Sequence, residues 1–583
     1  MTATDTTAEA RQITLTMPRP VTLAAIVTGT VPFVIQAWLT LTGYFAHDDF
    51  LILSEAARHG PLDVGYLFQD YSGHIAPGGF LLAWLVTAIA PLNRVLAVLP
   101  LLAMQAAASV LLWRALVRIF GRRWTLLLPL AVYAFSPLIL FPTLWWAYGI
   151  QLVPVLLAMF GAITAHLTYL RDRTTKHLVI TVAWTVAGMA FYEKAGLIPP
   201  VLFGLTLLLG ERVHWRVWLV HGVVLVGYAV TFVSLTTSRV KDSLPAAEST
   251  VEFVGRAVVD TFLPSLFGGP WTDPVPGGGG TISTSPLWLR GAVVLLAVIV
   301  IGGSLLKARR RALPAWTLLA AYLSVDLALV VVTRLPEIGP LIGTDPRYIA
   351  DAVPVTALCA TFAYLKPGES TGGLKRPVVL GLVALFAISA TFSFLQLAPA
   401  LRFAKSKQYV ATARTALVDN PSMVLYDTQV PNDIMLAWFL DNARSSKVIG
   451  LLPQRPKFDQ PAEEMYLLDD NGSPHKITGV KDPVVGRTGP VDKCGYPVDE
   501  QVVTIPLSGR VEGRRLLRME YYTSSAGPVR LTLGTATQEV NFAEGLHELY
   551  VVVNGKSDRL EINRTTKVYP MCVVDVRIGS PAT

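Results

Sequence analysis

Long apolar runs follow one another through the first 400 residues, and they limit what this chain can fold into. The first, VTLAAIVTGTVPFVIQAWLTLTG, covers residues 21–43 and is long enough for a helix that crosses a bilayer. Hydrophobic residues make up 52% of the 583 residues and charged residues only 15%, whereas soluble domains carry roughly a quarter charged residues. The chain is therefore predicted to be a polytopic α-helical membrane protein.

Basic residues between the apolar runs predict the topology. The formal net charge is +8, and most of the excess lies in short loops, which the positive-inside rule places in the cytoplasm. That distribution argues against a nucleic-acid partner. The basic loops contain Arg114, Arg118, Arg122 and Arg123; Arg171, Arg173 and Lys176; Arg212 and Arg216; Lys307, Arg309, Arg310 and Arg311; and Lys366, Lys375 and Arg376.

We therefore expect a multi-pass protein of the plasma membrane, with about eleven spans across residues 21–397 and a cytoplasmic N-terminus. Residues 1–20 would be a cytoplasmic tail, because no small-residue cleavage site interrupts the run that follows them. The count stays open at residues 75–113. The first of the two apolar runs there is short and is expected to lie along the outer leaflet.

The chain becomes more polar near residue 400. Residues 398–484 mix short apolar runs with charge and predict a small α/β linker subdomain. Residues 485–583 alternate apolar and polar residues between turn signals, as in VRLTLGTATQEVNFAEGLHELYVVV, and predict an extracytoplasmic antiparallel β-sandwich. Cys494 and Cys572 lie near its first and last strands, so a disulfide is expected if this part lies outside the cytoplasm.

Two adjacent carboxylates, Asp48 and Asp49, follow the first apolar run within a few residues. Placing charge near the hydrocarbon core costs free energy, so a structural or functional role is expected for the pair. It could cap a helix or remain solvated at the end of the span. Alternatively, neighbouring carboxylates beside His47 and several aromatic residues could take a proton from a hydroxyl nucleophile, or hold Mg²⁺, Mn²⁺ or Ca²⁺. Asp48 and Asp49 are therefore the candidate catalytic residues and candidate metal ligands.

Lys194 and Arg347 are the predicted outside cations most deeply embedded in apolar sequence. An ionisable residue in such a setting is a functional-site hypothesis, and fixed cations are what a phosphate anion requires. The structural alternatives are a pair of Lys194 with Glu193, and a pair of Arg347 with Asp345 or Asp351. Both cations are candidate phosphate ligands.

Aromatic residues gather in the predicted external segment FPTLWWAYG, which contains Trp145, Trp146 and Tyr148. Anchoring at the membrane interface would explain them, and so would a wall that stacks against a sugar. Together with Glu193 and Tyr348, they are the candidate contacts of a sugar or acceptor.

The order of these motifs resembles the GT-C superfamily of membrane glycosyltransferases, which use polyprenyl-phosphate sugars as donors. An acidic pair directly after the first span, in a long external loop, is similar to that superfamily. YSGHIAPGGFLLAWL is similar to the basic-residue-then-proline segment of protein O-mannosyltransferase-like and aminoarabinose-transferase-like members, with His74 and Pro77 on the motif. FYEKAGLIPP resembles a YEK element of actinobacterial relatives, and DPRYIADAVP resembles an RY…P element. The resemblance covers most of residues 20–400 and departs at His74, where many members keep Arg or Lys.

The resemblance implies an inverting hexosyl- or pentosyltransferase that uses a decaprenyl- or undecaprenyl-phosphate sugar. Lys194, Arg347 and His74 would hold the donor phosphate. Asp48, with Asp49, would take the proton of an acceptor hydroxyl on an envelope polysaccharide or glycolipid. Without a P-loop, a nucleotide-sugar donor is disfavoured, and some relatives of this kind work without a metal.

The layout also resembles mycobacterial arabinosyltransferases. That resemblance implies an actinobacterial enzyme of cell wall biogenesis whose β-sandwich is an accessory carbohydrate-binding module, although a β-sandwich alone shows no sugar binding.

Two other classes of protein remain open. A polysaccharide or lipid transporter would carry ionisable residues within its spans; Asp326, in AYLSVDLALV, is one such residue, but no internal repeat accompanies it. A non-catalytic envelope scaffold would use the β-sandwich only to bind glycan.

Overall fold

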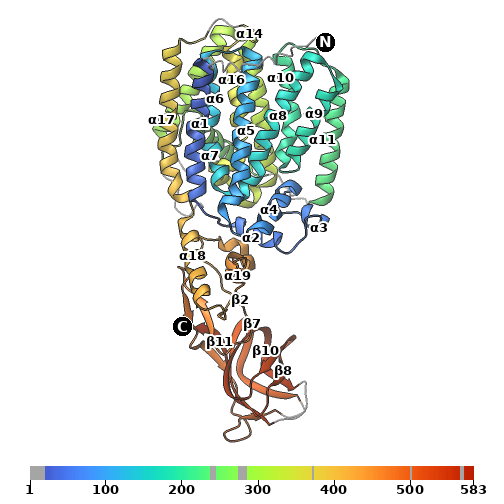
Figure 1. Cartoon of the computed structure of the whole chain (residues 1–583), viewed down its shortest axis with the longest axis vertical. Coiled ribbons are helices and arrows are strands. Elements are labelled where there is room, and N and C mark those ends of the chain that lie inside the picture. The colour runs from blue at the N-terminus through green and yellow to red at the C-terminus, as the bar shows by residue number, and fades with distance from the viewer. Residues whose placement is uncertain (1–19, 237–244, 273–284, 370–372, 499–501, 565–569) are drawn as a thin grey trace, which may run out of the picture. The chain divides into compact units, whose positions relative to one another are not determined.

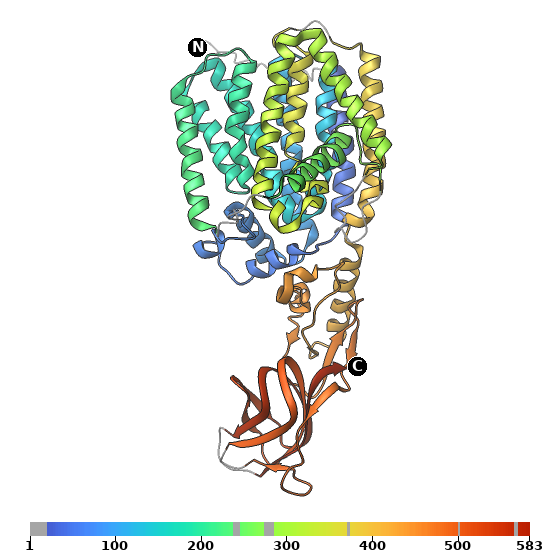
Figure 2. The same ribbon diagram turned by 180° about the vertical axis from the view of Figure 1, so that it is seen from behind.

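The computed structural model of the chain describes residues 20–236, 245–272, 285–369, 373–498, 502–564 and 570–583 (Figures 1 and 2). All but the last residue of the predicted cytoplasmic tail, residues 1–20, lies outside this range. The chain divides into two compact units. The helical unit comprises residues up to 42, 67–79 and 97–402, and the second unit comprises residues 43–66, 80–96 and 403–583.

Apolar helices build most of the helical unit, as the composition predicted. Their bounds are α1 (Pro20–Thr42), most of α5 (Arg94–Phe120), α6 (Leu127–Ala134), α7 (Pro137–Leu144), α8 (Trp146–Asp172), α9 (Thr175–Met189), α10 (Ile198–Leu208), α11 (Trp215–Leu235), α12 (Ala247–Gly255), α13 (Leu263–Leu266), α14 (Leu287–Thr333), α15 (Leu335–Ile338), α16 (Ala352–Tyr364) and α17 (Arg376–Leu401).

Six described helices are long and apolar enough to cross a membrane, or seven if the bent pair Trp124–Ala134 and Pro137–Leu144 is one span. Counted by length and composition, these helices are fewer than the predicted number of about eleven spans, for two reasons. The 47-residue α14 includes two predicted spans and bends at Ala308, whose φ of −156° is not helical. In addition, α9, α10 and α16 have 15, 11 and 13 residues, fewer than the roughly 20 of a full span.

The doubtful apolar run near residue 80 forms α4 (Pro77–Ile89), an apolar helix of only 13 residues. Proline suits its first position because the ring fixes φ at a helical value and the missing N–H has no acceptor there. The helix is too short for a full crossing, and its location along the outer leaflet stays a prediction.

The second unit combines short helices with two β-sheets. Its helices are α2 (Asp48–Ala56), α18 (Ala404–Asp419) and α19 (Ser445–Ile449), together with most of α3 (Val64–Leu67) and of α4. A four-stranded sheet has the order β2-β1-β3-β4, from Lys457–Phe458, Val424–Leu425, Met465–Leu468 and Pro474–Lys476. β1 pairs in parallel with both β2 and β3, and β3 pairs antiparallel with β4.

The C-terminal strands form one antiparallel sheet of seven strands rather than two separate sheets. Its order is β5-β11-β7-β10-β8-β9, with β6 beside β11. The strands are β5 (Gly479–Val485), β6 (Tyr496–Pro497), β7 (Val503–Thr523), β8 (Gly527–Leu533), β9 (Ala536–Phe542), β10 (Gly545–Arg564) and β11 (Met571–Ala582). The 21-residue β7 and 20-residue β10 pair along nearly their whole length, with a register shift between Ser557 and Arg559. Bulges of this kind let a strand bend, so one sheet encloses the core that two sheets of a sandwich would enclose.

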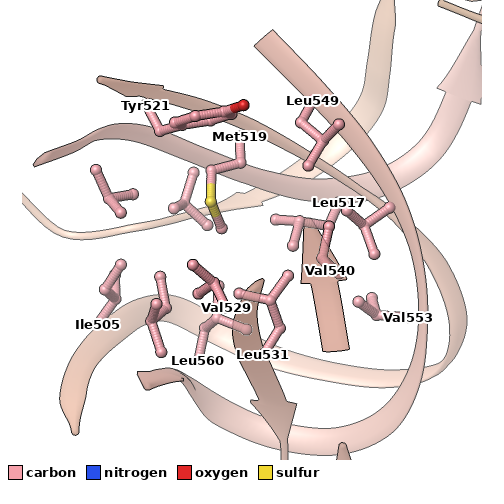
Figure 3. Close-up of a cluster of buried hydrophobic side chains, with 14 of the residues drawn as sticks. Ile505, Leu517, Met519, Tyr521, Val529, Leu531, Val540, Leu549, Val553 and Leu560 are labelled. Carbon is pink, nitrogen blue, oxygen red and sulfur yellow. The ribbon is translucent and has the colours of Figure 1, made fainter. Parts of the chain in front are cut away.

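Period-two alternation places one face of these strands in the core (Figure 3). Leu517, Met519 and Tyr521 of β7 all point into it and are at most 1% exposed. Leu516, on the opposite face of β7, packs in a second cluster with Met465 and Ile477 from the α/β part. Cys494 and Cys572 form a disulfide near β6 and β11, so a covalent bond ties the last strand to the segment before β6.

Candidate active site

Arg347 lies in a turn-rich segment between α15 and α16 that consists of two short 3-10 turns, Pro340–Thr344 and Pro346–Tyr348. The carboxylate of Asp345 accepts a bond from the backbone N–H of Arg347 at 3.0 Å, and from its Nε and Nη2 at 2.9 and 2.6 Å. Asp345 is buried, whereas the Arg347 side chain is 27% exposed. The local pair with Asp345 that the sequence left open is therefore formed.

Two side chains from distant parts of the chain hold the backbone of this segment. Tyr148 of α8 donates to the carbonyl of Arg347 at 2.6 Å. Lys194 donates to the carbonyl of Tyr348 at 2.9 Å. These bonds fix the position from which the Arg347 guanidinium projects.

Aromatic rings pack against that guanidinium. Its central carbon lies 4.5 Å from the ring centroid of Trp145 and 5.6 Å from that of Tyr348, within the range of a cation–π interaction. Trp146 is fully buried and donates to the carbonyl of Ala97 at 2.9 Å. Trp145 is thus a support for Arg347 and Trp146 is a core residue, so membrane anchoring does not account for either side chain.

Lys194 lies in the 3-10 turn Glu193–Leu197 between α9 and α10, and it is paired with two aspartates. Its Nζ is 2.7 Å from Oδ1 of Asp326 in α14 and 2.7 Å from Oδ1 of Asp351 next to α16. Tyr322 donates to the other oxygen of Asp351 at 2.7 Å. Lys194 is only 5% exposed and both aspartates are 0% exposed. We call Lys194, Asp326 and Asp351 the buried ion trio.

The buried ion trio changes the interpretation of Lys194. Its Nζ donates to Asp351 and to the carbonyl of Tyr348 and forms an ion pair with Asp326, so its contacts resemble those of a structural cation. The local pair with Glu193 that the sequence considered is replaced by two long-range pairs. Burial lowers the pKa of Lys194, but the two carboxylates raise it more strongly, so the net pKa lies above its ordinary value.

His74 joins Glu193 to Arg334 at the end of α14. Its Nδ1 lies 2.7 Å from Oε1 of Glu193, and its Nε2 lies 2.6 Å from Nη2 of Arg334. Because the guanidinium can only donate, Nε2 of His74 is the acceptor in its contact with Arg334. Burial raises the pKa of Glu193, but His74 and Arg334 lower it more, so the net pKa is below its ordinary value.

Arg334 supplies a fixed positive charge beside His74. It also donates to the carbonyl of Ser72 at 2.6 Å. Burial raises the pKa of the Tyr348 hydroxyl, and the charges of Arg347 and Arg334 oppose that rise. The adjacent residues Glu193 and Lys194 connect the two arginines: Glu193 reaches Arg334 through His74, and Lys194 donates to the carbonyl of Tyr348, whose ring lies against Arg347. We call Arg334 and Arg347 the guanidinium pair.

Arg334 was not among the candidate residues predicted from the sequence, and it lies in the segment TRLPEIGP. An arginine directly after an apolar run was its only local signal. Its role depends on contacts with residues about 140 and 260 positions earlier in the chain, which periodicity does not reveal.

A second residue that the sequence did not single out is the acid Asp260, which lies near the turn Pro340–Thr344. It is 2% exposed and its Oδ1 is 2.7 Å from Nε of Arg290. The segment around it, Arg256–Phe262, is a π-helix, a geometry frequent at functional sites. The adjacent Thr261 donates to the carbonyl of Gly343 at 2.9 Å. Gly343 has no room for a side chain, because a Cβ there would lie 2.5 Å from the carbonyl of Phe253.

Asp48 and Asp49 belong to the second unit, where they open α2. Asp49 is fully buried, and its Oδ2 accepts from the N–H of Ala46 at 3.0 Å. Asp48 is half-buried and occupies the first position of the helix, where backbone N–H groups and the helix dipole favour negative charge. The two acids therefore have different surroundings: Asp49 braces the turn and Asp48 is the more exposed.

The backbone before the pair is strained. His47 has φ 53° and ψ −126°, a combination that costs on the order of 1–3 kcal/mol for a residue with a side chain. Its N–H donates to the carbonyl of Ile434 at 2.8 Å, which helps to hold it there. Strain of this kind concentrates at functional sites.

A buried cation accompanies Asp49. Arg94 is 6% exposed, interacts electrostatically with Asp49 and lies 5.3 Å from the ring centroid of Phe45. Asp49 is thus occupied by a backbone N–H and a positive charge. The described residues also contain no group of three or more His, Cys, Asp or Glu side chains arranged for a metal ion. A divalent cation held by Asp48 and Asp49 stays a prediction.

No protein-family model matches the chain, and no curated protein matches it. Among solved structures, it is similar to ArnT from Cupriavidus metallidurans in the apo state, with 14% identity over 78% of this chain and 94% of that chain and a TM-score of 0.43. It is similar to arabinofuranosyltransferase AftD from mycobacteria, with 10% identity over 95% and 58% and a TM-score of 0.41.

A third similar structure is arabinosyltransferase EmbB from Mycobacterium smegmatis, with 12% identity over 97% of this chain and 65% of that chain and a TM-score of 0.31. All three proteins are GT-C membrane glycosyltransferases, the superfamily that the motifs resemble. These likenesses are weak. The function proposed below therefore depends on the residues of this chain.

Proposed function

We propose that the chain is a membrane glycosyltransferase that takes a sugar from a polyprenyl-phosphate donor and passes it to a hydroxyl of an envelope glycan or glycolipid. The observation that carries this proposal is the guanidinium pair. Arg347 is held by Asp345 and Trp145, and Arg334 by Ser72 and the His74–Glu193 pair.

A phosphate group is the anion that suits two fixed guanidinium groups, because each presents N–H donors in a planar fork. Arg347 keeps 27% of its side chain exposed, so it can contact a ligand while Asp345 holds it. A polyprenyl phosphate offers the anion together with an apolar chain that suits a protein rich in apolar helices. ArnT from Cupriavidus metallidurans has been solved with undecaprenyl phosphate bound.

The donor-phosphate roles of the sequence candidates are revised accordingly. Arg347 contacts the phosphate directly. His74 orients Arg334, which provides a fixed positive charge. Lys194 acts as a positioning residue, because it holds the carbonyl of Tyr348 beside Arg347. Tyr148 does the same for the carbonyl of Arg347.

Asp48 is the proposed base. The acceptor oxygen attacks the anomeric carbon and its proton passes to the Asp48 carboxylate, while the bond from that carbon to the phosphate oxygen breaks. The electron pair of the broken bond leaves with the polyprenyl phosphate, whose charge the guanidinium pair stabilises. A single displacement of this kind inverts the anomeric configuration. The sheet of the second unit would bind the acceptor glycan as an accessory module.

Donor binding can be tested without knowing the sugar, because undecaprenyl phosphate itself is a suitable probe. We expect Arg347→Gln to weaken its binding to the full-length protein in detergent by about 10- to 100-fold, the loss of one charge-assisted contact of roughly 1.5–3 kcal/mol. The matched control is Arg402→Gln, since Arg402 also stacks on a tryptophan, 5.2 Å from the ring centroid of Trp38. Equal affinity of the wild type and Arg347→Gln for undecaprenyl phosphate would contradict the phosphate-binding role proposed for Arg347.

Asp48→Asn tests the chemical step. In a transfer assay with labelled polyprenyl-phosphate sugars, it should lower turnover by about 10²- to 10⁴-fold and leave undecaprenyl phosphate binding unchanged. A scaffold or a transporter would instead give no transfer with the wild type. The transporter alternative is weakened because Asp326, the acid that motivated it, pairs with Lys194.

A further inference from the structure

A second charged site lies beside the bend of α14. A pocket of about 590 Å³ is lined by four basic residues, Arg309, Arg310, Arg311 and Lys366, and by an apolar wall. The apolar lining residues are Leu207, Leu208, Ala308, Pro314, Phe362 and Pro367. This volume lies within the roughly 300–1,000 Å³ of small-molecule sites.

The pocket lies at the opposite end of the helical unit from the guanidinium pair. Along α14, Arg311 precedes Asp326 of the buried ion trio by 15 residues, which is about 23 Å at 1.5 Å per residue. The two arms of α14 meet at the bend, at the end of the helical unit drawn uppermost in Figure 1. Since the hydrocarbon core of a bilayer is about 30 Å thick, a bilayer crossed by this arm of α14 would have the pocket and the trio in opposite halves.

Positive charge exceeds negative charge around the pocket. Lys366 pairs with Glu369 at 2.5 Å. Arg311 donates to the carbonyl of Tyr364 at 3.2 Å, and its Nε has no hydrogen-bond partner among the described residues. Arg309 and Arg310 are exposed and form no ion pair within the described part of the chain. Such a pocket has capacity for an anion.

We propose that this pocket binds the phosphate headgroup of an anionic phospholipid from the leaflet opposite the candidate active site. The positive-inside rule accounts for basic residues at this end of the helices, but it does not require a cavity among them. Basic pockets between membrane helices suit lipid headgroups. The apolar wall supports a lipid over a soluble phosphate, because Leu207 is 53% exposed on the outside of α10 and offers a surface for acyl chains.

The test uses native mass spectrometry of the full-length protein in detergent, titrated with dioleoylphosphatidylglycerol. Replacing Arg309, Arg310 and Arg311 together by Gln should weaken binding about 100-fold, at roughly fivefold for each lost charge near a membrane surface. Lys366→Gln alone should weaken it about fivefold and is a second variant if the triple variant does not fold. Dioleoylphosphatidylcholine, which has no net charge, tests the role of the headgroup charge. Glycerol phosphate, which has no acyl chains, tests the role of the lipid chains.

The matched control removes three charges from basic loops that do not line the pocket, with Arg171, Lys176 and Arg212 changed to Gln. Wild-type affinity in this control, with preference for phosphatidylglycerol over phosphatidylcholine, would support the site. Equal losses in both triple variants would overturn it, because net charge alone would then explain binding. Glycerol phosphate that binds as tightly as the lipid would overturn the lipid assignment.

Discussion

The two ends of the helical unit differ in how far their cations are paired with acids. At the end with the candidate active site, cations are matched to acids: Lys194 to two aspartates, Arg347 to Asp345 and Arg290 to Asp260. At the other end, three consecutive arginines line a pocket where Glu369 is already paired with Lys366.

This difference separates two uses of charge. Paired and buried charges have one geometry, because each partner loses much of its solvation and must be satisfied by the other. They can therefore hold a catalytic segment in place. Exposed cations remain solvated and mobile. They can therefore set the orientation of the protein in the membrane and bind anions. The comparison predicts large effects on folding at the first end and small ones at the second.

The largest effect is expected for Lys194→Met. It would leave the two buried carboxylates of Asp326 and Asp351 without their cation, which costs on the order of 3–5 kcal/mol. Denaturant-induced unfolding of the purified protein should show this loss. The triple variant Lys194→Met, Asp326→Asn and Asp351→Asn removes all three charges and should recover much of the stability. If Lys194→Met unfolds like wild type, the trio is not a structural unit.

A smaller loss is expected for Asp260→Ala, since Arg290 keeps 36% of its side chain exposed and can be solvated when its partner is removed. We expect a decrease of about 1–3 kcal/mol in the free energy of unfolding, from the lost charge-assisted bond. Glu252→Gln is the matched control, because Glu252 pairs with Arg256 on the exposed surface nearby. Such exposed pairs contribute about 0–1 kcal/mol. Equal effects would show that burial does not separate the two pairs.

The His74–Glu193 pair should make stability depend on acidity. The pKa of Glu193 is held below its ordinary value of 4.5, so its ionised form is stabilised by folding. That contribution is present above about pH 4.5 and is lost as the pH falls through the lower pKa of the folded protein. Glu193→Gln should therefore flatten the decrease of stability in this acid range. An unchanged acid profile would contradict the role given to the pair.

Sequence reasoning predicted well what is local. Arg347 and Asp345 are two residues apart, and their pair was foreseen as a structural alternative. Period-two alternation predicted the antiparallel strands whose inward residues include Leu517 and Met519. The short run at α4 was recognised as too short for an ordinary span.

Contacts between residues far apart in the sequence could not be predicted in the same way. Lys194 finds its partners 132 and 157 positions later in the chain, and only the fold brings these positions together. Asp326 was noticed as an acid within a span, yet its partner could not be named. The single sheet contains register shifts, such as the one between Ser557 and Arg559, which alternation does not encode. The number of spans was uncertain for a similar reason, because the bend at Ala308 and several short helices break the relation between apolar runs and crossings.

The smallest effect on stability is expected at the other end of the helical unit. Arg309→Gln combined with Arg310→Gln should change the free energy of unfolding by no more than about 0.5 kcal/mol for each residue, since both side chains are exposed. The measurement should be made in detergent free of anionic lipid, where no ligand contributes to stability. Adding dioleoylphosphatidylglycerol should then stabilise the wild type more than the variant, because a ligand that binds only the folded state raises its stability. A large loss without lipid would mean that these arginines are structural, and the contrast between the two ends would fail.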